Sequence, residues 1–234
     1  MSAPLAVALL VGVGLVSAAF GSPAGSADTN TAAAVATAPA SALPAGTYTS
    51  SAFQPAVTYT LPAGWDNPAD AADFFQLRPA GSEVAGIYLF RDPDPASQEA
   101  SCPEAAEPGV GTSAVELATW IRSLPGLVVS DPVPVTVGGL TGVGLDVGIV
   151  DGWTASCPFA NGLPTVPLFV GSAGTYRWVV AGEEQLRLAL LDVPGGGTVV
   201  VDIDAFEGGI IDDLLAAADP IVKSFEFAPI QPAP

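Results

Sequence analysis

The chain has 234 residues, of which 50% are hydrophobic, and its 24 acidic residues against 6 basic ones give a net charge of −18. Nucleic-acid binding needs clustered lysine and arginine to replace the counterions of the phosphates, and the basic residues here are scattered. The sequence contains no histidine, which excludes a Ser-His-Asp triad, a Cys-His pair and zinc sites with histidine ligands. We therefore expect no nucleic-acid partner. The simplest interpretation of the acidic excess is that it keeps the protein soluble.

The N-terminal segment is predicted to direct the protein to a membrane or across it. Residues 5–20 (LAVALLVGVGLVSAAF) are apolar without interruption, and a helix of this length would span about 24 Å, less than a bilayer core of about 30 Å. Signal peptidase requires small residues, and cleavage after Ala19, Ala24 or Ala27 would fit. No lysine or arginine precedes the apolar run. Residues 1–27 are therefore a signal peptide or an uncleaved N-terminal anchor, and we expect a bacterial protein that is secreted, extracellular or held in the cell envelope.

A linker is predicted between this segment and the folded part. Residues 28–45 (DTNTAAAVATAPASALPA) consist mainly of alanine, threonine, serine and proline. Such residues bury too little apolar surface to offset the entropy lost on ordering. We expect a flexible linker there, then a single α+β domain over residues 46–228 and a short tail over residues 229–234. The protein would contact a membrane only through an uncleaved N-terminal segment.

The domain is predicted to begin with strands. Residues 47–49 are β-formers, and residues 57–61 (VTYTL) alternate apolar with polar side chains, as a strand with one buried face does. Residues 62–65 are predicted to form a turn. Residues 73–77 and 85–90 are predicted to be two further strands.

A long loop rich in proline and acidic residues follows over residues 91–111, and it contains Cys102. The second cysteine, Cys157, lies in the same tripeptide, Ser-Cys-Pro. In an exported protein such a pair is most simply a disulfide, which would close a loop of about 55 residues and stabilise the fold by about 4 kcal/mol in the chain-entropy model. The alternative is a reactive thiol, but the sequence lacks both a CxxC spacing and a histidine that could activate one.

Two helices are predicted. Ser113 and Glu116 have the spacing of a capping box, and residues 125–126 (Pro-Gly) end this helix. Its apolar face consists of Leu117, Trp120, Ile121 and Leu124. The second helix is expected to bend at residues 219–220 (Asp-Pro). Its apolar residues are Ile211, Leu214, Leu215, Ala218 and Ile221 or Val222.

Strands fill the rest of the domain, and most of their connections have the length of hairpins. They are predicted at residues 127–130, 133–137, 143–150, 168–170, 177–180, 186–193, 198–204 and 224–227. The expected fold class is therefore α+β, an antiparallel β-sheet with two main helices packed on it.

Three pieces of sequence together suggest a family. They are the opening strand that runs into residues 61–65 (LPAGW), the first helix before a valine-rich strand with residues 138–142 (GGLTG), and the last helix that runs into residues 221–227 (IVKSFEF). This arrangement resembles the PsbP/Mog1-like α/β/α sandwiches, including exported LpqN-type proteins of actinobacteria, over about residues 46–228. The resemblance implies a non-enzymatic accessory, binding or envelope factor. The chain departs from the family by its two cysteine-containing loops, and no functional residue is carried over.

Acidic residues near the C-terminal end of the domain form a weak calcium candidate. Asp202 and Asp204 are expected on one face of a strand, with Glu207 just beyond it, and Ca²⁺ prefers oxygen ligands. The acids that an EF-hand loop requires at fixed spacing are missing. We expect a solvated strand face instead, near a helix start where carboxylates favour the helix dipole, and we assign no metal.

Two tryptophans are candidate ligand contacts. Trp65 and Trp153 lie in predicted loops beside glycine and aspartate, where the face of an indole could stack on a sugar. The alternative is packing at the edge of the core. No catalytic residue is assigned.

The sequence thus predicts an exported, non-catalytic binding or accessory domain of the cell envelope that has no cofactor and whose partner is an unknown protein or small ligand. Two alternatives stay open. One is a structural envelope protein, in which the linker and acidic surface provide spacing and solubility. The other is a carboxylate-dependent hydrolase, which needs two carboxylates facing one cleft with separated pKa values.

Overall fold

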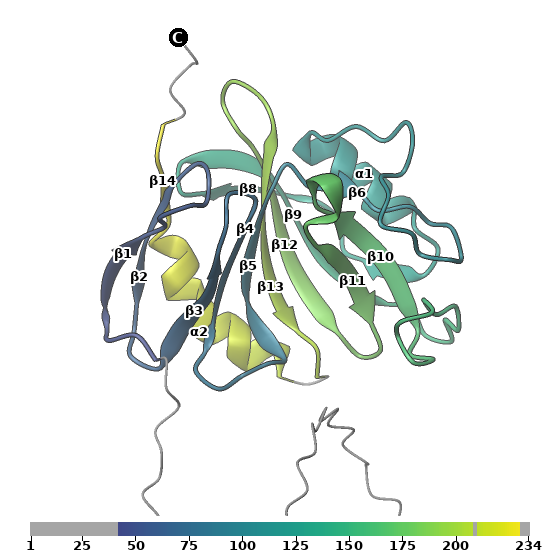
Figure 1. Ribbon diagram of the computed structural model, residues 1–234, viewed down its shortest axis with the longest axis horizontal. Coiled ribbons are helices and arrows are strands. Elements are labelled where there is room, and N and C mark those ends of the chain that lie inside the picture. The colour runs from purple at the N-terminus through teal and green to yellow at the C-terminus, as the bar shows by residue number, and fades with distance from the viewer. Residues whose placement is uncertain (1–41, 208–209, 230–234) are drawn as a thin grey trace, which may run out of the picture. The chain divides into compact units, whose positions relative to one another are not determined.

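A computed structural model describes residues 42–207 and 210–229 (Figure 1). The predicted signal or anchor segment, residues 28–41 of the predicted linker and residues 230–234 lie outside the described residues. Of the linker, Leu43 is described, and its backbone N–H donates to the carbonyl oxygen of Trp65 at 2.7 Å. In the described ranges, no helix has both the length and the apolar composition needed to span a membrane.

The largest sheet of the described chain has eight strands, and each neighbouring pair is antiparallel. Across the sheet these strands are β3 (Trp65–Asp70), β4 (Phe74–Pro79), β5 (Ala85–Arg91), β13 (Thr198–Ala205), β12 (Gln185–Asp192), β9 (Leu140–Ile149) and β7 (Leu127–Val129), with β8 (Val133–Val137) also paired to β9. Residues of β13 alternate between two separate cores: Val199, Val201 and Ile203 face one, and Val200 faces the other. The sheet is therefore the middle layer of the molecule.

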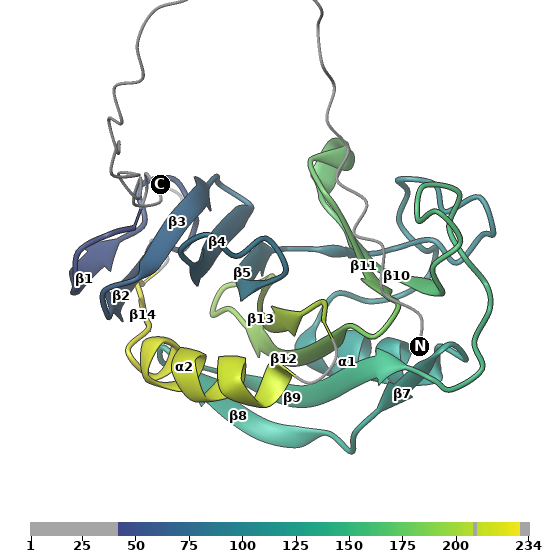
Figure 2. The ribbon, with the colours of Figure 1, turned by 90° about the horizontal axis from the view of Figure 1, so that it is seen from below.

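One face of this central sheet is covered by helix α2 (Ile211–Lys223) and by a small sheet of β1 (Gly46–Thr49), β2 (Val57–Leu61) and β14 (Glu226–Phe227). The other face is covered by helix α1 (Ala114–Ser123) and by a small sheet of β6 (Asp94–Pro95), β10 (Thr165–Val170) and β11 (Arg177–Ala181), beside a short 3₁₀ turn at Ser172–Gly174. Figure 2 shows α2 and the β10–β11 pair on opposite sides of β12 and β13.

The expected fold, two main helices packed on an antiparallel sheet as in a PsbP/Mog1-like sandwich, is wrong. The described chain is β-rich, with fourteen strands in three sheets and two α-helices. The hairpin segments at residues 47–61 and 165–181 were expected to extend one sheet, but they form covering layers of their own. The alternation of a strand marks its buried face and does not specify the sheet to which the strand belongs.

Residues 62–65 were expected to form a turn with Trp65 in a loop, and this too is wrong for Trp65. The turn ends at Gly64, and Trp65 begins β3, where it pairs with Pro79. The register of β3 shifts between Asp66 and Ala69, which accommodates Pro68, a residue that cannot donate to a ladder. The polar residues and the proline of this strand concealed it in the sequence.

The capping box of α1 is confirmed. The backbone N–H of Glu116 donates to the hydroxyl of Ser113, and the backbone N–H of Ser113 donates to the Glu116 carboxylate at 3.1 Å. The Ser113 hydroxyl, which donates to the Glu116 carboxylate at 2.6 Å, and the Ser113 backbone N–H hold the pKa of Glu116 below its ordinary value. Pro220 lies inside the last turns of α2, which continues to Lys223.

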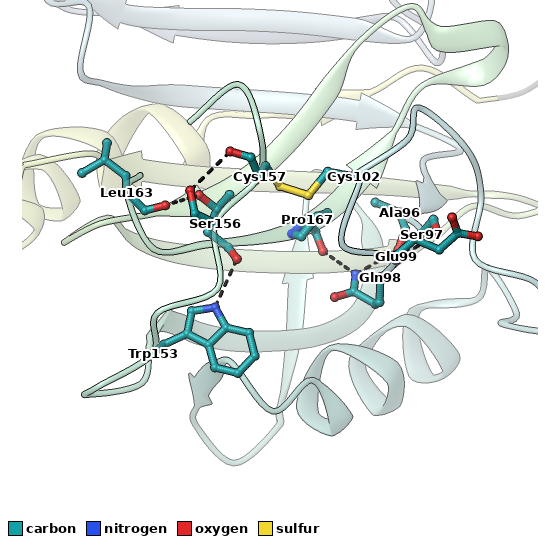
Figure 3. Close-up of a disulfide and its surroundings, with 11 residues drawn as sticks. Ala96, Ser97, Gln98, Glu99, Cys102, Trp153, Ser156, Cys157, Leu163 and Pro167 are labelled. Carbon is teal, nitrogen blue, oxygen red and sulfur yellow. Dashed lines mark hydrogen bonds between the residues drawn. A yellow bond between two sulfur atoms is a disulfide. The ribbon is translucent and has the colours of Figure 1, made fainter. Parts of the chain in front are cut away.

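The disulfide between Cys102 and Cys157 is confirmed, with a Cα–Cα distance of 5.6 Å. Figure 3 shows that it joins the long acidic loop to the loop before β10. The side-chain amide of Gln98 also donates to the carbonyl oxygen of Pro167 in β10 at 2.9 Å. The disulfide and this bond together fasten the long loop to the covering sheet.

Candidate ligand-binding groove

The candidate site is a groove with a volume of about 580 Å³ between α2 and the strands β8, β9, β12 and β13. Small-molecule sites are concave, mostly apolar and typically about 300–1,000 Å³ in volume. Most of the lining side chains are apolar, and the central ones are Val133, Val135, Ala189, Val201, Leu215 and Val222.

The floor of the groove contains small residues that lie next to one another across neighbouring strands. Val133 of β8, Gly144 of β9, Ala189 of β12 and Val201 of β13 are paired in register, and residues paired in this way point to the same face of a sheet. The side chains of Val133 and Val135 lean over Gly144 and fill the space beside it. Ala189 is only partly buried, and its small side chain leaves room for the hollow.

Helix α2 forms the opposite wall. Its buried residues Leu214, Ala218 and Ile221 pack into the core over β13, β5 and β2. Leu215 and Val222 lie on the neighbouring stripe, are only partly buried and line the groove. Since the helix is anchored over β13 and β5, it leaves Ala189 of β12 partly exposed, whereas Val133 and Val135 cover Gly144 of β9.

Two ion pairs border the groove. Arg187 and Asp146 are cross-strand partners, and the guanidinium donates to both carboxylate oxygens at 2.7 and 3.2 Å. The hydrogen bond to Asp146 raises the pKa of Arg187. Lys223 donates to Asp219, one turn earlier on α2, at 2.8 Å. The groove thus combines an apolar wall and floor with paired charges of both signs.

The groove continues past the Arg187–Asp146 pair into a second hollow of about 410 Å³, which reaches the beginning of α2 at Ile211. Arg187, Asp146 and Leu215 line both hollows. Gly148 of β9 lies in the floor here, as Gly144 does in the first hollow. Glycines that face α2 therefore shape both parts.

The structure places the two candidate tryptophans away from this groove. Trp65 is buried in the core on the α2 side of the sheet. Trp153 (Figure 3) is partly buried and donates its indole N–H to the carbonyl oxygen of Thr165 at 3.2 Å. Its ring also lies against Gly126. Their role as ligand contacts stays a prediction.

The structure separates the three residues of the calcium candidate. Asp202 and Asp204 point from β13 toward the β10–β11 side and are 0% and 4% exposed, whereas Glu207 is exposed beyond the strand. A solvated face was expected for the two aspartates, and that expectation is wrong. The described residues contain no group of three His, Cys, Asp or Glu side chains that could hold a metal ion.

A different carboxyl group joins the two aspartates. Glu184, in the turn between β11 and β12, is 7% exposed and shares a hydrogen bond with Asp204. Burial raises the pKa of Glu184 to about 7, and burial is also the main cause that raises the pKa values of Asp202 and Asp204. Because these carboxyl groups are enclosed, they do not face the groove or any substrate in it.

Comparison with known proteins does not identify a family. No family model matches the chain, and no curated protein matches it. Solved structures that resemble it include a crystal structure at 1.50 Å resolution of a protein from Bacteroides thetaiotaomicron VPI-5482, with 11% sequence identity and a TM-score of 0.32. The match covers 74% of this chain and 45% of that one, so the chain spans less than half the length of that protein. The resemblance to PsbP/Mog1-like proteins stays a prediction.

Sequence reasoning missed the residues of the groove. Gly142, Gly144 and Gly148 recur at every second or fourth position of β9, and this spacing puts them on one face of a strand. This glycine pattern is visible in the sequence, but by itself it does not predict a groove. The groove also depends on Ala189, more than forty positions away, which the register of β12 places beside Gly144.

Proposed function

We propose that this protein is an exported, non-catalytic binding protein of the cell envelope that holds one small, largely apolar molecule in the groove beside α2. The observation that carries the proposal is the 580 Å³ hollow over Gly144 and Ala189. At roughly 30 Å³ for each water-sized group, such a volume holds a molecule of about twenty non-hydrogen atoms.

The chemistry of the lining favours an amphipathic ligand. An aliphatic body would lie on Val135, Ala189 and Val201, where it removes apolar surface from water. Its polar end would reach the Arg187–Asp146 pair, whose exposed oxygens and N–H groups can accept or donate further hydrogen bonds. The apolar contacts provide affinity, and the ion pair provides orientation.

The contacts of the charged residues support binding rather than catalysis. The Asp146 and Asp219 side chains at the groove are bonded to Arg187 and Lys223. The buried aspartates whose pKa values are raised mainly by burial, Asp202 and Asp204, lie on the opposite face of β13. Export is supported by the disulfide, because such bonds form and persist in oxidising compartments.

The test is a thermal-shift and calorimetric panel on the oxidised chain with decanoate, decylamine and decanol, which share an alkyl chain and differ at the polar end. A ligand at 100 times its dissociation constant stabilises the native state by about 2.7 kcal/mol, which raises Tm by roughly 5–10 °C. The same measurement is made on Ala189→Leu, which fills the hollow, and on Ala217→Leu, which adds the same atoms at an exposed position of α2.

We expect at least one ligand of the panel to bind, with an affinity more than tenfold lower in Ala189→Leu and unchanged in Ala217→Leu. Equal affinities in the two variants would place the ligand elsewhere and contradict the proposal. A panel without any shift would also contradict it, and it would favour the structural envelope role.

A further inference from the structure

The strongest feature outside the groove is the cluster of Asp202, Asp204 and Glu184, which we call the carboxyl cluster. It lies on the face of the central sheet that β10 and β11 cover. The two aspartates come from the middle of the sheet, and the glutamate comes from the turn that joins β11 of the covering sheet to β12 of the central sheet. The cluster therefore connects the covering layer with the sheet beneath it.

A hydrogen bond between two carboxyl groups requires a proton, because two carboxylates have only acceptor oxygens. The carboxyl groups of Asp204 and Glu184 lie close enough to interact in this way. The Glu184 carboxyl also has a backbone partner, since the backbone N–H of Ala181 donates to Glu184 Oε2 at 2.6 Å. The closed arrangement of the β11–β12 turn therefore favours a bound proton between the two carboxyl groups.

The polar groups that face the cluster are neutral or acidic. The indole N–H of Trp178, on β11, donates to Asp202 Oδ2 at 2.8 Å. Tyr88 of β5 is the register partner of Asp202, and its phenol hydrogen-bonds with Gln76 of β4. Burial and the two aspartates raise the pKa of Tyr88, so the phenol stays protonated and adds no positive charge.

Basic side chains near this face are bonded to other acids. Arg78 of β4 lies beyond Gly86, the register partner of Asp204, and it donates to Asp66 at 3.1 Å. Arg177 on β11 is paired with Glu104. None of the ion pairs in the part of the chain that the structure describes includes a member of the carboxyl cluster.

Two oxygen atoms of the cluster have no hydrogen-bond partner among the described residues, Asp202 Oδ1 and Asp204 Oδ1. A buried ionised oxygen without a partner is strongly unfavourable, whereas a protonated carboxyl group avoids most of that cost. The carboxyl groups are buried, no ion pair of the described residues includes them, and two of them interact directly. All three features favour a state in which the cluster holds protons.

We propose that the carboxyl cluster is a proton-held latch, which fastens β11 and the β11–β12 turn over the central sheet in acidic surroundings and releases them as the pH rises. This inference is independent of the groove and of its ligand. β11 and this turn are the part that opens, because β12 is held inside the central sheet, whereas Glu184 lies in the turn and is the member of the cluster nearest to solvent.

The direction of the effect follows from proton linkage. The folded state keeps protons that the unfolded chain releases near pH 4. The contribution of the carboxyl cluster to the free energy of unfolding is therefore fully present below that pH. It falls as the pH rises toward about 7, where Glu184 ionises in the folded protein. The loss continues at higher pH, because the pKa values of both aspartates are raised as well.

The experiment compares wild type, Glu184→Gln and Glu183→Gln from pH 5 to pH 8. Glutamine at position 184 can accept from Ala181 and donate to Asp204 at every pH, whereas Glu183 is exposed and controls for the loss of one charge. We expect Tm of wild type and Glu183→Gln to fall by at least about 5 °C over this range, with a clearly smaller fall in Glu184→Gln. Hydrogen exchange, corrected for intrinsic rates, should show at least about tenfold lower protection of the Ala181 amide at pH 8 in wild type.

Equal pH dependence of the three proteins would overturn the latch, as would unchanged protection of β11 and the β11–β12 turn across the range. A third measurement does not depend on any variant. Carbon-13 NMR of the carboxyl groups in the wild type should show Glu184 and Asp204 titrating well above the exposed acids, and titration of both near pH 4 would contradict the proposal.

Discussion

The two faces of β13 differ in a way that strand alternation alone does not explain. Val201 and Ile203 point toward α2 and line an open groove, while Asp202 and Asp204 point the other way and are enclosed. Apolar side chains thus border a ligand-sized space, and acidic ones are sealed from water. The covering layer decides this: α2 leaves Ala189 of β12 partly exposed, whereas β10 and β11 close over the acids.

The comparison separates two kinds of chemistry on one strand. On the groove side, the charges are exposed and paired, as between Arg187 and Asp146, so that they contribute little to stability and remain available to a ligand. On the closed side, the carboxyl groups lack counter-charges and respond to pH. Each face can therefore be altered without changing the other.

The largest change in the free energy of unfolding is expected when an acidic residue is placed on the α2 side of β13. Val201→Asp would place a carboxylate against the core beneath α2, where Val201 is 2% exposed. Because the neighbours of Val201 in this core are apolar, the carboxylate would be buried without a hydrogen-bond partner. We expect a loss of about 4 kcal/mol in the free energy of unfolding at pH 7. Urea denaturation measures it, with Asp202→Asn as the control, which should change stability by less than half as much. A smaller loss in Val201→Asp than in the control would show that the two faces are not distinct.

The next effect concerns the loops that fasten the covering sheet. Replacing both Cys102 and Cys157 with serine should lower the free energy of unfolding by about 2–4 kcal/mol. Hydrogen exchange should become faster in β10 and β11 and remain nearly unchanged in α2, because the disulfide is joined to the acidic side of the sheet. A uniform increase across both sides would argue against independent covering layers.

The smallest effect is expected from the exposed ion pair. Asp146→Asn should change the free energy of unfolding by less than about 1 kcal/mol. It frees Arg187 at the groove, so that binding of decanoate should strengthen and binding of decylamine should weaken, as calorimetry can measure. Asp131→Asn, at a more exposed position of the same groove edge, is the matched control. Unchanged preference in Asp146→Asn would remove the ion pair from the proposed ligand contacts.

Local patterns predicted most elements of this fold. The Ser113–Glu116 capping box located α1, and the alternation in residues 57–61 located β2, because both signals depend only on neighbours within a few positions. The cysteine pair was also predictable, since the chain has two cysteines and they leave one intramolecular pairing. The strand β3 was missed because Asn67 and Pro68 mask its pattern.

The acids of β13 show where local patterns fail. Asp202 and Asp204 lie in a run of β-branched apolar residues, which is typical of a strand buried on both faces, but acidic side chains are rarely buried. The acidic character of Asp202 and Asp204 therefore predicted exposed side chains, whereas both are buried in the structure. Glu184, which interacts with Asp204, is brought close only by the turn between β11 and β12.

The sequence by itself determined the acidity, the absence of histidine chemistry, the two helices, the disulfide and most of the strands, because these depend on composition or on short-range spacing. Only the tertiary structure decided that the strands form three sheets, that Gly144 and Ala189 lie side by side and that Asp202 and Asp204 are enclosed. Those features depend on register between distant strands and on the layer that covers each face. Both proposed sites belong to this second group.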